Sequence, residues 1–139
     1  MKYKTLFIPA LVLAFAAPMT FAVDKISPMT VNGAKTVDAA KAKALFDKKV
    51  VFVDTRNDKD WDAGRIPGAM HLDINKGAFT KDTLGAKVKK DQEVVMYCNG
   101  EKCLRSSEAA EQAVGWGFTK VYYFRDGFPA WQDAGYPVE

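Results

Sequence analysis

The sequence predicts an α/β protein with a mainly parallel sheet that is covered by helices on both faces. Short runs rich in β-branched and aromatic residues, at 50–53, 93–97 and 121–124, alternate with segments of helical apolar spacing. This alternation is typical of βαβ units. The runs are almost continuously apolar, as in strands buried on both faces. In such sheets ligands bind beyond the carboxyl ends of the strands.

The first segment, residues 1–22, is expected to be a cleavable signal peptide. Lys2 and Lys4 form a basic start, an apolar run follows at 6–17, and Thr20–Ala22 offers a cleavage site with small residues. The apolar run is short, because a membrane-spanning helix needs about 20 such residues. We therefore expect export to the periplasm, with an uncleaved anchor as the alternative.

The mature chain is expected to be close to neutral. All 17 acidic residues lie beyond residue 22, and the net charge of +3 falls to +1 without Lys2 and Lys4. Nucleic-acid binding needs clustered excess charge, whereas the lysines at 41–49 and 87–90 are interspersed with apolar residues, as on solvated helix faces. We expect no nucleic-acid partner, and no membrane association after signal cleavage.

The first elements of the mature chain follow an N-terminal extension at 23–35. Its residues 23–32 have little periodicity and are expected to lie over the surface of a domain at 36–139. Asp38 is a suitable N-cap for a short helix through 40–46, whose apolar spacing fits one buried face. The run 50–53 is then predicted to be a buried strand.

The middle of the chain contains shorter elements. Trp61 is predicted to lie in a second short helix, and 64–69 is a turn in which Pro67 fixes its own φ. A short strand is expected at 70–74. The segment 79–88 is predicted to be an irregular or helical crossover.

The last third of the chain is predicted to hold two strands and two helices. The strand 93–97 ends at a cysteine, and Ser106 or Ser107 is expected to cap the helix that follows. A strand at 121–124 and a short helix at 128–134 complete the fold. The residues of the longer helix that are expected to face the sheet are Ala109, Ala110, Ala113 and Val114.

Cys98 is the candidate catalytic residue, because it directly follows a buried strand and precedes a polar loop and a helix start. Such a loop can direct several backbone N–H groups at one spot, which together with the helix dipole favours an anion. A thiolate is stabilised there, and nearby cations add to the effect. The loop residues expected to bind substrate are Asn99, Gly100, Glu101, Lys102, Leu104 and Arg105.

Cys103 forms a Cys-x4-Cys pair with Cys98, and its role has several interpretations. Export implies an oxidising compartment, in which a cysteine pair often forms a disulfide. Cys103 could equally act as a resolving or regulatory thiol for a persulfide, sulfenate or mixed disulfide on Cys98. A structural role and a resolving role are both left open by the sequence.

Three motifs in this order resemble the rhodanese family. Residues 51–56, Val-Phe-Val-Asp-Thr-Arg, resemble its first core strand with an Asp-x-Arg ending. Residues 60–69 resemble its Gly-His-Ile-Pro-Gly-Ala signature, with Arg65 in the histidine position. Residues 121–131 resemble its closing strand, Gly-Gly turn and Trp helix, with Asp126 in place of one glycine.

This resemblance implies a three-layer fold with a central five-stranded, mostly parallel sheet. It also implies that Cys98 takes a sulfane sulfur from a thiosulfate-like anion, becomes a persulfide, and passes the sulfur to a thiol or another thiophilic acceptor. The expected export makes a periplasmic thiol protein or a small sulfur anion the candidate partner. Backbone amides of 99–104 would hold the persulfide or the donor's oxygens. Neither a metal nor an organic cofactor is implied.

The loop departs from the commonest pattern of the family. An Arg or Thr usually stands five residues after the cysteine, but here that place holds Cys103, and Arg105 comes seven residues after Cys98. The loop is also longer than the Cys-x5-Arg loop of the phosphatase relatives. A wider loop affects whether thiosulfate is the specific sulfur donor. It also makes a phosphatase or arsenate-reductase activity a minor alternative.

The other polar and aromatic candidates have structural interpretations. Arg56 is expected either to form an ion pair with Asp54 or to line the pocket. His71, the only histidine, is expected at the rim of the site. Weaker rim candidates are Arg125 and Asp126, and the tryptophans expected to cover the sheet are Trp61, Trp116 and Trp131.

Two alternative functions remain beside the sulfurtransferase hypothesis. A thiol–disulfide or redox-sensing protein would use the Cys98/Cys103 pair. A non-catalytic rhodanese module would bind a partner through its loops, and would more often have lost the cysteine at the strand end.

Overall fold

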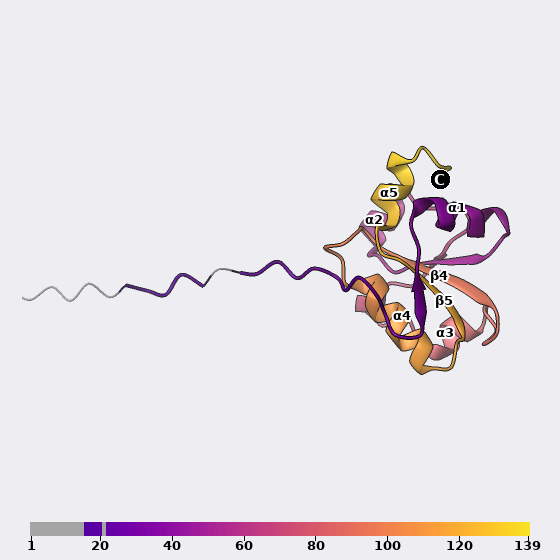
Figure 1. Cartoon of the computed structure of the whole chain (residues 1–139), viewed down its shortest axis with the longest axis horizontal. Helices are drawn as coiled ribbons and strands as arrows, with labels where there is room; N and C mark the ends of the chain where they lie inside the picture. Colours follow the sequence, from indigo (N-terminus) through magenta and orange to yellow (C-terminus); the bar gives the residue numbers. More distant parts are fainter. Residues whose placement is uncertain (1–15, 21) are drawn as a thin grey trace, which may run out of the picture.

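Five parallel strands form the sheet at the centre of the fold (Figure 1). The computed structural model describes residues 16–20 and 22–139. The strands are β1 (Ala34–Thr36), β2 (Val51–Asp54), β3 (Met70–His71), β4 (Glu93–Tyr97) and β5 (Lys120–Phe124), and they lie in the order β1-β5-β4-β2-β3. The predicted α/β class with a five-stranded, mostly parallel sheet is confirmed.

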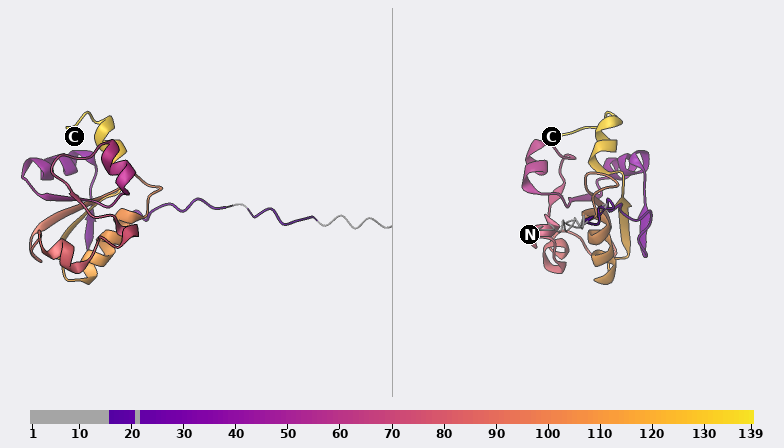
Figure 2. Two further views of the ribbon diagram at one scale, coloured as in Figure 1. Left: turned by 180° about the vertical axis from the view of Figure 1, so that it is seen from behind. Right: turned by 90° about the vertical axis from the view of Figure 1, so that its left-hand side faces the viewer.

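Helices cover both faces of this sheet, which gives the predicted three layers. The helices are α1 (Ala39–Asp47), α2 (Asp58–Ala63), α3 (Lys81–Gly85), α4 (Arg105–Gly115) and α5 (Gly127–Asp133), with a short 3-10 helix, η1 (Ile74–Lys76). Figure 1 shows α1, α2 and α5 on one side of the sheet and α3 and α4 on the other, and Figure 2 shows the same layers from behind and from the side.

The packing of strand β4 explains why the predicted strands have almost continuously apolar sequences. Its side chains alternate between two hydrophobic clusters. Val94 and Met96 pack with residues of α3 and α4, whereas Val95 and Tyr97 pack with residues of α1 and α5. Both faces of the strand are buried, so a polar residue at either face would lose its contact with water.

One predicted helix cap is confirmed and another is wrong. Asp38 caps α1, and its carboxylate accepts a hydrogen bond from the amide of Lys41 at 2.8 Å. Helix α4 starts at Arg105, with Leu104 at the N-cap position and no side-chain cap. Ser106 and Ser107 therefore do not cap α4 but are buried within its first turn, because the helix begins earlier than the serines suggested.

One short element differs from its prediction, and another was not predicted. The strand expected at 70–74 is shorter, since β3 ends at His71. Asp73 then accepts a hydrogen bond from the amide of Asn75 and caps η1, which diverts the chain from the sheet. Strand β1, which no pattern in the sequence indicated, pairs with β5. The segment 79–88 was expected to be irregular or helical, and it contains the short helix α3.

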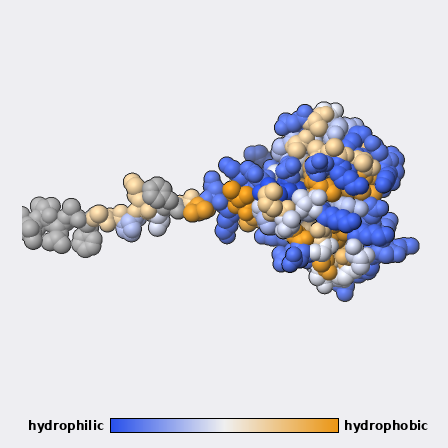
Figure 3. All heavy atoms as spheres, in the orientation of Figure 1, coloured by the Kyte–Doolittle hydropathy of each residue, from blue (hydrophilic) through white to orange (hydrophobic). Residues whose placement is uncertain are grey.

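The N-terminal segment reaches the domain at residues 27–29. The hydroxyl of Tyr123 donates to the carbonyl of Pro28 at 3.0 Å, and Thr36 donates to the carbonyl of Met29 at 2.9 Å. Residues 16–20 and 22–26 are exposed and run away from the domain (Figure 1). Hydrophobic spheres gather on this segment next to the domain, whereas the visible face of the domain is mainly hydrophilic (Figure 3).

Most of the predicted signal peptide lies outside the described residues. Its basic start and much of its apolar run fall within residues 1–15, and Phe21 of the expected cleavage site is also outside them. None of the helices in the described residues has the length and apolar character that a membrane span requires.

Candidate active site

The sheet register brings three chain segments together at the carboxyl edge. Asp54 of β2 lies beside Tyr97 of β4, and Tyr97 lies beside Phe124 of β5. The residues that follow these three, including Cys98, therefore emerge at the same level of the sheet. This is the edge at which parallel α/β sheets bind ligands.

The backbone of Cys98 is held from both sides. The carbonyl of Tyr97 accepts hydrogen bonds from the amide and the hydroxyl of Thr55, at 3.2 and 2.9 Å. The carbonyl of Cys98 accepts one from the amide of Phe128 at 2.8 Å. Gly127 permits this approach, because its φ is +61° and a Cβ there would overlap the Cys98 carbonyl oxygen.

The loop after Cys98 turns tightly, and several of its amides make no hydrogen bond to the described residues. The amide of Cys103 donates to the carbonyl of Gly100 at 3.0 Å, and the Glu101 carbonyl accepts from the amide of Ser27 at 2.7 Å. Within the described part of the chain, no protein acceptor meets the amide groups of Asn99, Gly100, Glu101, Lys102 and Leu104. Such unsatisfied donors, next to the start of α4, suit an anionic ligand.

Cys98 and Cys103 form a disulfide, with their Cα atoms 6.2 Å apart. The two cysteines differ in access, because Cys98 is 0% exposed whereas Cys103 is partly exposed. Cys103 lines an open cleft of about 490 Å³ at the start of α4. The other residues of this cleft are Asn75, Asn99, Lys102, Leu104, Arg105 and Glu108.

Arg56 is buried beneath the loop and held by three groups. Its Nε and Nη2 donate to the carboxylate of Asp54, at 2.7 to 3.1 Å, and Nη2 also donates to the carbonyl of Gly64 at 2.7 Å. Nη1 donates to the side-chain oxygen of Asn99 at 3.2 Å, and Asn99 in turn donates to Asp60 at 2.8 Å. Arg56 thus forms the predicted ion pair and also positions the first residue after Cys98.

The surroundings of Arg56 and of the neighbouring Tyr97 determine the protonation state of each side chain. Burial alone would lower the pKa of Arg56, but the hydrogen bonds and negative charge of Asp54 outweigh it, so the pKa lies above its ordinary value. The guanidinium also lies 4.4 Å from the ring centre of Phe128. Burial, together with the charge of Asp54, raises the pKa of the Tyr97 hydroxyl. Arg56 is therefore a permanent cation and Tyr97 a neutral phenol.

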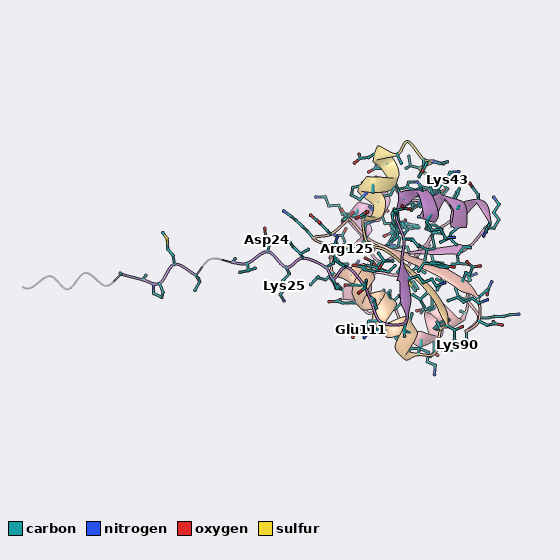
Figure 4. All side chains as sticks on the ribbon, viewed as in Figure 1. Asp24, Lys25, Lys43, Lys90, Glu111 and Arg125 are labelled. Carbon is teal, nitrogen blue, oxygen red and sulfur yellow. A yellow bond between two sulfur atoms is a disulfide. The ribbon has the colours of Figure 1, made fainter. Side chains whose placement is uncertain are left out.

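Arg105 and Arg125 bracket the loop. Arg105 donates from Nε and Nη2, at 3.0 and 2.9 Å, to the side-chain oxygen of Asn75 when that amide is oriented to satisfy both groups. Arg125 donates to the carbonyl of Ser27 at 3.0 Å and lies 3.7 Å from the carboxylate of Glu101. Figure 4 shows Arg125 where the N-terminal segment reaches the domain.

The remaining candidates lie around this site. His71 stacks on Trp61 with ring centres 4.6 Å apart and hydrogen-bonds the Arg56 carbonyl at 2.9 Å. Trp131 is fully buried, whereas Trp61 and Trp116 are half-buried, and Asp126 is exposed. Within the described residues, no cluster of three or more His, Cys, Asp or Glu side chains could hold a metal ion.

Two residues of the site had no signal in the sequence. Ser27 and Asn75 lie far from Cys98 along the chain, and only the fold brings them to the loop. Their sequence surroundings contain no motif, so spacing alone could not identify them.

Comparisons with known proteins agree with this geometry. The family model described as "Rhodanese-like domain" matches residues 38–134. Thiosulfate sulfurtransferase GlpE of Pseudomonas savastanoi pv. phaseolicola is 35% identical over 106 residues, which cover 76% of this chain and 92% of that protein. An HTH-type transcriptional regulator of Mycobacterium tuberculosis is 35% identical over 91 residues, or 66% of this chain, which spans only 38% of the regulator's length.

A solved structure shares the same architecture. The BH2092 protein of Bacillus halodurans superposes with a TM-score of 0.67 at 25% identity, covering 76% of this chain and 77% of that one. The family model matches well over half of the chain, and the sulfurtransferase GlpE relative is matched over nearly its full length. This chain belongs to the rhodanese-like domain family.

Proposed function

We propose that this protein is a sulfurtransferase that carries sulfane sulfur as a persulfide on Cys98. The observation that supports the proposal most strongly is the position of Cys98, at the carboxyl end of β4 and at the start of a loop in which most amides have no acceptor among the described residues. A thiolate or persulfide anion there would receive hydrogen bonds and the positive end of the α4 dipole.

The transfer has two steps. The Cys98 thiolate attacks the outer sulfur of a thiosulfate-like anion, a new S–S bond forms, and sulfite leaves with the electron pair of the broken bond. A thiophilic acceptor then attacks the outer sulfur of the persulfide, and Cys98 leaves as a thiolate. The loop amides would stabilise the negative charge in both steps.

The cysteine pair makes this activity dependent on reduction. In the disulfide, Cys98 has no free thiolate and its sulfur is buried. A thiol must therefore open the disulfide before sulfur uptake. An exported protein would meet such thiols in the periplasm, and we propose the periplasm as its location and a periplasmic thiol protein as one acceptor.

The disulfide also favours a second candidate, a thiol–disulfide exchange protein that uses the same pair. This alternative predicts reversible oxidation of the pair without uptake of sulfur. The two functions are therefore distinguished by whether the outer sulfur of the donor is transferred to Cys98.

The test is steady-state formation of thiocyanate from thiosulfate and excess cyanide, with protein that has been reduced and freed of reductant. Reduced Cys103→Ser, which cannot re-form the disulfide, should form thiocyanate at a steady rate, reduced wild type should form it until the pair is oxidised, the oxidised wild type should show a lag or no reaction, and Cys98→Ser should fall to the level of buffer. Equal rates for wild type and Cys98→Ser would refute the proposal, and inactivity of reduced Cys103→Ser would favour thiol–disulfide exchange.

A further inference from the structure

We infer that Cys103 resolves the Cys98 persulfide, so that the protein releases sulfide and returns to the disulfide. This inference rests on the proposed persulfide on Cys98 and adds a second activity, the reduction of a sulfane sulfur donor at the expense of a dithiol. It starts from the difference in access between the two cysteines and from the bond that joins them.

The disulfide fixes which sulfur Cys103 attacks. Because the sulfur of Cys103 bonds to that of Cys98 within the folded loop, its thiolate reaches the inner sulfur of a Cys98 persulfide without a change of fold. The Cys98 backbone would not need to move, since its carbonyl is already bonded to the amide of Phe128. Attack on the outer sulfur would instead move the persulfide to Cys103.

The step balances without an external oxidant. The Cys103 thiolate forms a bond to the inner sulfur of Cys98, the bond between the inner and outer sulfur breaks, and the outer sulfur takes a proton from water and leaves as hydrosulfide. The outer sulfur gains the electron pair and is reduced, Cys103 is oxidised, and the sulfur of Cys98 stays at the oxidation level of a disulfide that it reached when the persulfide formed.

A dithiol then restores the reduced pair, and the structure indicates its direction of attack. In the disulfide Cys98 is buried, whereas Cys103 lines the cleft together with Lys102, Arg105 and Glu108, whose net positive charge attracts a thiolate. The incoming thiolate bonds to the Cys103 sulfur, and Cys98 leaves as a thiolate toward the loop amides. A stabilised leaving thiolate speeds such an exchange.

A second thiol of the reductant then breaks the mixed disulfide on Cys103. Over the whole cycle, thiosulfate and a dithiol give sulfite, sulfide and a disulfide. A protein dithiol or a small dithiol is thus the chemical class of partner that this site requires.

The experiment is a single turnover under anaerobic conditions. Reduced wild type, Cys103→Ser, Cys103→Ala and the double variant Cys98→Ser/Cys103→Ser are freed of reductant and mixed with thiosulfate. Sulfite, sulfide and the intact mass of the alkylated protein are then measured. The double variant is the control for sulfide that does not arise from the pair.

The wild type should release sulfite and sulfide in equal amounts and become the disulfide. Both single variants should release sulfite, keep one added sulfur on Cys98, and lose sulfide release to the level of the double variant. A wild type that keeps the added sulfur on Cys98, or moves it to Cys103, without releasing sulfide would overturn the inference and leave the proposed function intact. Absence of added sulfur from both single variants would instead refute the proposed function and this inference with it.

Discussion

Arg56 shows how one residue joins the stability of the fold to the geometry of the site. Its charge is matched by Asp54, which is fully buried, and its remaining donors hold Gly64 and Asn99. A partner for Asp54 was predictable from the Asp-x-Arg ending of the strand. The hydrogen bond between Arg56 and Asn99 was not predictable, because it joins residues that are 43 positions apart in the sequence.

Replacement of Arg56 by Met should lower the free energy of unfolding by about 3–5 kcal/mol, because it leaves the buried Asp54 carboxylate without a counter-charge. Urea unfolding of the oxidised protein measures this loss. Arg65→Met is the matched control. Its pair with Glu139 is partly exposed, so the loss should be about 1 kcal/mol or less. Similar losses in the two variants would contradict the role given to Arg56.

Tyr97 should make the fold sensitive to alkaline pH. Its pKa is raised by burial and by the charge of Asp54, so above about pH 10 the unfolded chain releases this proton while the folded chain keeps it. Stability therefore falls as pH rises, with a slope of up to about 1.4 kcal/mol per pH unit from this residue. Unfolding of oxidised wild type and Tyr97→Phe between about pH 9 and pH 11 measures the difference. Identical slopes would disprove this assignment.

At the scale of elements, strong local patterns were predictable and short polar elements were not. The buried strands β2, β4 and β5 had continuous apolar runs, and α1 had both a cap and an apolar face. Strand β1 has only three residues, Ala-Lys-Thr, and owes its conformation to pairing with β5. The start of α4 was misplaced because buried serines resemble caps when burial is unknown.

The turn from β5 into α5 gives a prediction at this scale. Gly127→Ala should lower the free energy of unfolding by at least about 2 kcal/mol, because its φ is positive and a Cβ would overlap the Cys98 carbonyl. It should also lower sulfur uptake by displacing Cys98. Gly115→Ala, at the end of α4 with open space around it, should be neutral or slightly stabilising. Urea unfolding that ranks these two variants equally would count against this packing.

At the scale of the whole molecule, the position of the site followed from the topology. A parallel sheet places the residues after β2, β4 and β5 at one edge, so Cys98, Arg56 and Arg125 were expected near one another. The redox form of the cysteine pair was left open by the sequence, because a spacing is compatible with both a bonded and a free pair. The contribution of Ser27 depends on how the N-terminal segment crosses the loop, which no local pattern encodes.

Reduction of the disulfide should leave the fold intact. The cysteines are separated by only 5 positions, so the closed loop is small and its loss should cost at most about 2 kcal/mol of unfolding free energy. Urea unfolding of oxidised wild type, reduced wild type and Cys103→Ser measures this difference. Collapse of the reduced protein to an unfolded chain would contradict a working state with free thiols.

The most direct test of the central claim is the site of sulfur attachment. Reduced Cys103→Ser and Cys98→Ser are exposed to thiosulfate, alkylated, and analysed by intact mass and peptide mapping. The account predicts one added sulfur on Cys98 in Cys103→Ser, removed by cyanide, and none in Cys98→Ser. An unmodified Cys98 in Cys103→Ser that is folded and reduced would contradict it.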